Sequence, residues 1–189
     1  MSVPGSTSDT GKDHVETEGL LALELGGRCG FALWRPGSSP LLGSNVLPGE
    51  AADLGQALAA FADWLELILT TNRPLRVVYQ APWSGEGSGG RANPETLRRL
   101  ICLAGVAALV CHREAVPASE ANVQAVRRHL LGNGRPPSKA AQAALQARAQ
   151  SLGLEPRNAA ERDAFALLDY AAANRGLSLN ALVKGRAEP

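Results

Sequence analysis

The stretch LLALELGGRCGFAL, residues 20–33, decides the fold. Residues 20–25 are apolar apart from one acid, which predicts a buried strand bounded by Gly26 and Gly27. The two glycines provide a tight turn, and residues 29–34 predict the antiparallel partner of the first strand. The segment therefore predicts a hairpin in which the first strand lies inside a sheet.

The acid in this strand, Glu24, is the first candidate for chemistry. Burying a charge without a partner costs free energy, so an acid in an otherwise apolar strand needs a reason. Successive side chains alternate between the two faces of a strand, and Leu23 and Leu25 should therefore face away from Glu24. A solvent-facing Glu24 with no function is the alternative.

Outward from the hairpin, the pattern alternates strands with helical segments. Further strands are predicted at residues 41–47, 75–79 and 114–117, and helices at 51–70, 93–112, 119–131, 138–152 and 159–173. Ser119 and Ser138 are the expected N-caps of two of these helices. This order predicts one α/β domain with a mixed sheet over residues 19–176. Residues 1–18 and 177–189 are expected to be tails, the first of them disordered.

Composition excludes several classes of protein. The 189 residues suit one domain, and the formal net charge of +1 does not by itself indicate a nucleic-acid binder. Cys29, Cys102 and Cys111 lack metal-ligand spacing and are expected to be small buried side chains in a reducing, cytoplasmic setting. No apolar run reaches the ~20 residues that cross a bilayer, so no membrane partner is expected.

Acids and amides at the ends of predicted elements suggest one site. Nuclease chemistry on phosphodiesters commonly uses two metal ions held by carboxylates from separate elements. Besides Glu24, the sequence offers Gln80 at the end of LRVVYQAP and the acids Glu161 and Asp163 in the last helix. Acids also stabilise a helix N-terminus through its dipole, which explains Glu161 equally well.

One long segment of the sequence contains no acids. Residues 121–154 contain no Asp or Glu. Solvated helix faces normally mix charges of both signs, so this bias favours a phosphate-binding surface over a plain solvated face. The expected DNA contacts are Arg91, Arg127, Arg128, His129, Arg135, Ser138, Lys139 and Arg148, with Arg98 and Arg99 adding positive charge nearby.

Four motifs in order resemble the RuvC-type Holliday-junction resolvases of the RNase H-like superfamily, especially their prophage-encoded branch. They are LLALELGGRCGFAL, VVYQAP, the segment from VPASEANVQ to QARAQSLG, and NAAERDAFALLDYA. The resemblance implies an RNase H-like α/β fold with a mixed sheet flanked by helices, a homodimer, and branched or four-way-junction DNA as partner. It also implies Mg²⁺ as the cofactor of an acidic site.

The departures from this family are as informative as the match. The family has Asp at Glu24 and Glu at Gln80, and it has an acid where Ala159 and Ala160 stand; Asp163 alone matches in type. Mg²⁺ requires near-ideal geometry at ~2.1 Å, so a lengthened acid and a neutral amide weaken the site. We therefore expect a catalytic site reduced to Glu24, Gln80 and Asp163, with weak metal binding by Glu24 and Asp163 or none.

Three functions stay open at this stage. The first is a DNA-binding RuvC-like protein of phage or mobile-element recombination or packaging, with reduced or no nuclease activity. The second is an active Mg²⁺-dependent junction endonuclease that uses Glu24, Asp163 and either Glu161 or Asp169. The third is a non-catalytic adaptor that binds a protein, for example a phage or packaging partner.

Overall fold

The computed structural model describes residues 19–35, 37–49, 53–82, 93–132, 138–177 and 179. Its centre is a five-stranded sheet in the order β3-β2-β1-β4-β5. The strands are β1 (Leu20–Glu24), β2 (Arg28–Trp34), β3 (Leu41–Val46), β4 (Arg76–Gln80) and β5 (Ala118–Ala121). The pairs β1–β2 and β2–β3 are antiparallel, whereas β1–β4 and β4–β5 are parallel, so the sheet is mixed as predicted.

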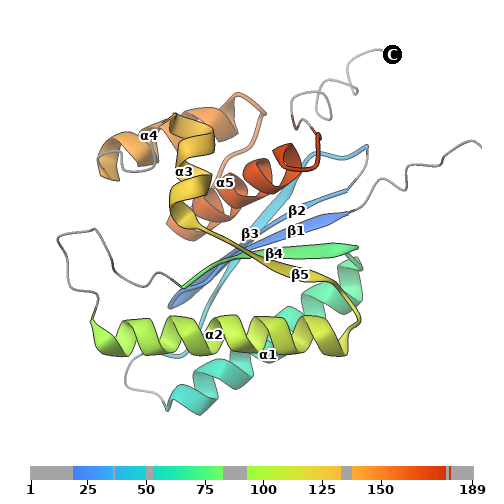
Figure 1. Cartoon of the computed structure of the whole chain (residues 1–189), viewed down its shortest axis with the longest axis vertical. Coiled ribbons are helices and arrows are strands. Elements are labelled where there is room, and N and C mark those ends of the chain that lie inside the picture. The colour runs from blue at the N-terminus through green and yellow to red at the C-terminus, as the bar shows by residue number, and fades with distance from the viewer. Residues whose placement is uncertain are drawn as a thin grey trace, which may run out of the picture.

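Helices cover both faces of the sheet, which gives three layers (Figure 1). The helices α1 (Leu54–Asn72) and α2 (Pro94–Arg113) pack on one face. The opposite face carries α3 (Val123–Leu131), α4 (Ser138–Gln150) and α5 (Ala159–Ala173). The side chains of β1 alternate between two apolar cores, because Leu20 and Ala22 face α5 while Leu21 and Leu23 face α1 and α2. Leu25 belongs to the second core too, as the alternation from Glu24 predicts.

The helix α5 lies unusually close to β2. A Cβ built on Gly30 would lie 2.1 Å from the carbonyl oxygen of Ala160, a distance that no side chain can occupy. Gly30 therefore allows the first turn of α5 to rest directly on the sheet. Along the rest of α5, Ala164, Phe165 and Leu168 are fully buried and hold the helix in this position.

One predicted strand and one predicted cap were wrong. Residues 114–117 form the turn after α2, and the fifth strand comes later, so Ser119 lies inside β5 and does not cap a helix. The actual N-cap of α3 is Asn122, whose side-chain oxygen accepts a hydrogen bond from the Gln124 amide at 2.8 Å. The prediction failed because Ser and Asn are both favourable N-cap residues. Ser119 is part of β5, so Asn122, which directly precedes α3, caps the helix.

The two expected tails lie mostly outside the described residues. Residues 1–18 are not described, but Leu177 packs against the core and Leu179 is buried, although both fall in the expected C-terminal tail. Cys29 and Cys111 are buried and unpaired, in keeping with their expected role as small core side chains, whereas Cys102 is only partly buried. Among the described helices, none combines the length and apolar character needed to cross a membrane.

Candidate functional site

The site predicted from sequence is one pocket of about 140 Å³. Glu24 and Gln80 are the last residues of β1 and β4, which are parallel neighbours, so their side chains meet at one edge of the sheet. Asp163 reaches the same pocket from the first turns of α5. The outer wall comes from α3 and α4, which contribute Arg127 and Gln142. The structure thus brings together the three residues that the sequence singled out.

Glu24 is the most perturbed acid of this pocket. Its Oε2 atom is buried and has no hydrogen-bond partner among the described residues. Burial above all, and the nearby Asp163 carboxylate in addition, raise the pKa of Glu24 to about 8, while Arg127 opposes the shift. At neutral pH Glu24 therefore holds a proton for most of the time, so the pocket carries less negative charge than its sequence suggests.

The other two charged groups of the pocket partly neutralise each other. Burial raises the pKa of Asp163, while the guanidinium groups of Arg162 and Arg127 lower it. Arg127 was predicted as a DNA contact, yet it also lines the acidic pocket. Sequence spacing gave no sign of this position, because it depends on how α3 crosses the sheet edge.

This donor set does not fit a pair of Mg²⁺ ions. Such a pair is held by several carboxylates, and here two carboxyl groups and one amide share the pocket with a guanidinium. A fixed positive charge in the same pocket repels a second cation. Across the described ranges, no group of three His, Cys, Asp or Glu side chains is placed to hold a metal ion.

Glu161, the other candidate ligand, points to a different place. Its carboxylate accepts hydrogen bonds from the Ser44 hydroxyl at 3.0 Å and the Arg157 amide at 2.9 Å, and it pairs with the Arg157 guanidinium at 2.9 Å. Burial alone would raise the pKa of Glu161, but these contacts lower it below its usual value. With 1% of its surface exposed, Glu161 ties the start of α5 to β3 and lies away from the Glu24 pocket.

Asp169, the remaining alternative ligand, is the centre of a second ionic cluster. Its carboxylate binds Arg148 Nη2 at 2.9 Å and lies 3.4 Å from His129 Nε2. The His129 ring also stacks edge-on against Tyr170. These contacts fasten α3 and α4 to α5. Arg148 and His129 were predicted to face DNA, and the cluster leaves their side chains 28% and 32% exposed.

The remaining predicted DNA contacts divide into three groups. Arg128 and Lys139 are exposed on α3 and at the start of α4, and other residues of these two helices line the acidic pocket. Ser138 begins α4 as its first residue and not as a cap preceding it, and its side chain is not described. Arg91 and Arg135 lie outside the described residues.

Comparison with known structures defines the class of fold. The mixed sheet flanked by helices is the RNase H-like fold of RuvC-type proteins. Thermus thermophilus RuvC superposes with a TM-score of 0.61 and 15% identity over 84% of this chain and 96% of that chain. The same protein in complex with Holliday junction substrate gives a TM-score of 0.64 and 16% identity over the same shares of the two chains.

A eukaryotic structure is similar as well. The yeast mitochondrial Holliday junction resolvase Ydc2 superposes with a TM-score of 0.55 and 12% identity over 90% of this chain and 82% of that chain. No family model and no curated protein sequence matches the chain. At these identities the likeness defines the fold, and function must be argued from the site.

The protonated state of Glu24 makes a prediction about stability. Because the folded protein keeps a proton that the unfolded chain releases above pH ~4.5, stability should fall as pH rises towards 8. Glu24→Gln removes this dependence. The free energy of unfolding of the variant, relative to that of the parent, should increase by about 1–4 kcal/mol on going from pH 5 to pH 8, as measured by urea denaturation. Glu66→Gln on exposed α1 is the control, and an equal difference at both pH values would contradict the assignment.

Proposed function

We propose that this protein binds branched DNA, such as a four-way junction, and has little or no nuclease activity. The observation that carries the proposal is the pocket in which Glu24, Gln80 and Asp163 meet Arg127. On a RuvC-type fold this pocket stands at the carboxyl edge of β1 and β4, but its donor set suits two Mg²⁺ ions poorly. A protein that retains the fold and the basic surface can bind DNA without cutting it.

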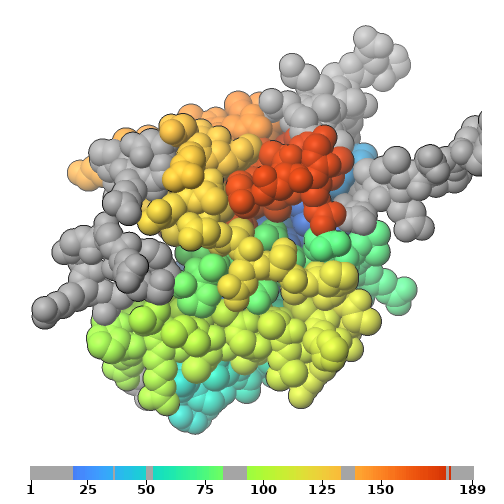
Figure 2. Space-filling view, viewed as in Figure 1, coloured from blue at the N-terminus to red at the C-terminus, as the bar shows by residue number. Residues whose placement is uncertain are grey.

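The proposed DNA surface consists of α3, α4 and the rim of the pocket. This region has no acids in residues 121–154, and Arg127, Arg128 and Lys139 are exposed there. In Figure 2, α3 (yellow-orange) lies beside α5 (red), and the visible part of α4 (orange) lies above them. Arg148 and His129 contribute indirectly, because their pairing with Asp169 holds the two helices in place. Phosphate contacts of this kind position DNA without reading its sequence.

We further propose that the protein works as a homodimer, since a four-way junction offers two symmetric strands. The resemblance of the sequence to RuvC-type resolvases suggests this assembly. The face of α2 supports it, because Ile101 and Leu109 are 53% and 47% exposed with Gly105 between them. A Cβ on Gly105 would meet nothing within 4 Å, so a second helix can approach there.

The biological setting is also a proposal. The motifs resemble the prophage-encoded branch of RuvC-type proteins, which favours recombination or packaging of phage or mobile-element DNA in the cytoplasm. A phage or packaging protein is then a reasonable partner. A protein that bound such a partner but no DNA would instead fit the adaptor hypothesis, which the next experiment distinguishes.

The DNA surface predicts salt-dependent binding. Each neutralised phosphate adds about −0.9 to the slope of log affinity against log salt concentration. Lys139→Ala should weaken binding to all junction sequences alike and reduce the slope by about one unit, measured by fluorescence anisotropy. Arg113→Ala, at the far end of α2, is the matched control and should change neither quantity. If the parent protein binds neither duplex nor junction DNA, the proposal of DNA binding is wrong.

The α2 face predicts the oligomeric state. The parent should be a dimer by light scattering at micromolar concentration, and Ile101→Asp should convert it to a folded monomer because a charge would enter an apolar contact. Leu67→Asp is the control, since Leu67 is an exposed apolar residue on α1. A monomeric parent at high micromolar concentration would rule out this assembly.

The altered donor set predicts the outcome of a reversion experiment. The parent should not cleave a labelled four-way junction in Mg²⁺. The combined variant Glu24→Asp, Gln80→Glu, Ala160→Asp returns four carboxylates to the site, because position 160 lies one helical turn from Asp163. We expect this variant to bind Mn²⁺ by calorimetry and to gain cleavage, whereas single changes do little because ligands of one site act together.

The matched control adds Asp163→Asn to the same triple variant and should abolish metal binding again. Two results would refute the proposal of a degenerate site. One is robust Mg²⁺-dependent cleavage by the parent. The other is a folded triple variant that binds DNA but no metal, which would mean that these positions do not form one metal site.

A further inference from the structure

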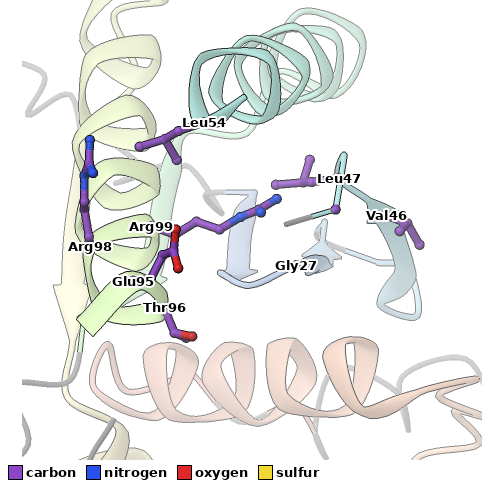
Figure 3. A pocket seen from close by; sticks show the side chains of 9 residues that line it. Gly27, Val46, Leu47, Leu54, Glu95, Thr96, Arg98 and Arg99 are labelled. Atoms are coloured by element: carbon purple, nitrogen blue, oxygen red, sulfur yellow. The ribbon is translucent and has the colours of Figure 1, made fainter. Parts of the chain in front are cut away.

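Two pockets of the molecule differ in how their polar groups are arranged. One of about 320 Å³ lies between the end of β3, the start of α1 and the first turns of α2. In Figure 3, Arg99 extends towards Leu47, Arg98 extends along α2, and the Thr96 side chain lies apart from both, so these groups do not converge. In the acidic pocket, by contrast, the charged groups act on one another. The acidic pocket is therefore the better candidate for a ligand site.

Opposite charges line the acidic pocket without touching each other. Burial raises the pKa values of Glu24 and Asp163, and the charge of Arg127 lowers both, so the guanidinium lies near both carboxyl groups. Among the described residues, however, Arg127 forms no ion pair with either of them. The space between them can be bridged by a ligand that accepts a hydrogen bond from the guanidinium and donates one to a carboxylate.

The rest of the pocket combines apolar side chains with two amides. The amides of Gln80 and Gln142 can each donate and accept hydrogen bonds. The apolar wall consists of Val123, Val126, Ala141, Leu145 and Ala166. An apolar wall with a few polar groups is typical of sites for small organic groups. Such a wall favours a flat ring with a polar edge over an ion that keeps its water.

The size of the pocket fits a single ring. Its volume is about 140 Å³. An apolar cavity of ~150 Å³ is known to hold one benzene molecule. A purine has two fused rings and needs more room than this. Among the parts of a nucleic acid, a pyrimidine base is therefore the best match in size.

The charges of the pocket favour a neutral ligand. A phosphate would be attracted by Arg127 but repelled by the Asp163 carboxylate, and a divalent cation would be repelled by Arg127. Cytosine is neutral and has an amino group beside a ring nitrogen and a carbonyl oxygen on one edge. Carboxylates of proteins accept hydrogen bonds from this amino group, and guanidinium or amide groups can donate to the two acceptors.

We propose that the acidic pocket receives an unpaired cytosine base of the branched DNA. Asp163 accepts a hydrogen bond from the amino group of the base, and Arg127 donates to its ring nitrogen or carbonyl oxygen. The inference rests on the proposed DNA-binding function, in which Arg128 and Lys139 on the same two helices hold the adjacent phosphates. A base must leave the stack to enter such a pocket, which costs least where it is unpaired, as at a branch point.

The test compares four-way junctions that differ in one nucleotide at the branch point. This nucleotide is an unpaired cytosine, thymine or adenine, or an abasic site. Binding to the full-length protein is measured by fluorescence anisotropy at constant salt. The cytosine junction should bind about tenfold more tightly than each of the other three, because only cytosine satisfies both the carboxylate and the guanidinium in a pocket of this size.

Two variants separate base recognition from general DNA binding. Asp163→Ala removes the acceptor and also a negative charge, so it should bind the abasic junction more tightly than the parent does, yet lose the preference for cytosine. Ala141→Met fills the pocket with a flexible side chain, leaves its charge unchanged, and should also abolish the preference. Lys139→Ala is the matched control, because loss of a phosphate contact should weaken all four junctions alike and leave the preference intact.

The experiment distinguishes failure of this inference from failure of the proposed function. If the parent binds none of the junctions, the proposed function is wrong. If the parent binds the junctions but does not distinguish cytosine from any one of the other three, the inference is wrong while DNA binding stands. A cytosine preference that survives in both Asp163→Ala and Ala141→Met would also overturn it, since the base would then be read elsewhere.

Discussion

The contact between α5 and the sheet is the constraint on which the rest of the molecule depends. Gly30 has no side chain, and the backbone of Ala160 occupies the space that a side chain would need. The helix consequently rests on β1 and β2 at a fixed height, and the buried network of Glu161 with Ser44 and Arg157 fixes its first turn against β3. This packing helps to place Asp163 beside Glu24 in one pocket.

Placing Asp163 beside Glu24 brings two carboxyl groups together, and two features of the pocket reduce their repulsion. Burial above all, and then the neighbouring Asp163 carboxylate, raise the pKa of Glu24 so that it holds a proton at neutral pH. Arg127 supplies a fixed positive charge to the same space. A proton on Glu24 and the guanidinium of Arg127 thus reduce the net negative charge of the pocket.

The sequence predicted most of the fold because the local signals are strong. The hairpin at residues 20–34, the helix at 159–173 and the meeting of Glu24, Gln80 and Asp163 all follow from apolar spacing, glycines and motif order. The failures occurred where two local signals compete, as for Ser119 and Asn122, or where long-range packing decides. No spacing rule indicates that Arg127 lines the acidic pocket or that Arg148 pairs with Asp169, since both depend on the crossing of α3 and α4 over α5.

The bond between Ser44 and Glu161 joins residues 117 positions apart, and the contact of α5 with β1 spans a similar length of chain. Closing so long a loop costs entropy before any contact repays it, which places this step late in folding. Until α5 has been synthesised and docked, the apolar face of the hairpin that includes Leu20 and Trp34 has no cover. On the ribosome that face stays uncovered until α5 has emerged, so the segment that defines the architecture is also the one most exposed to misassociation during synthesis.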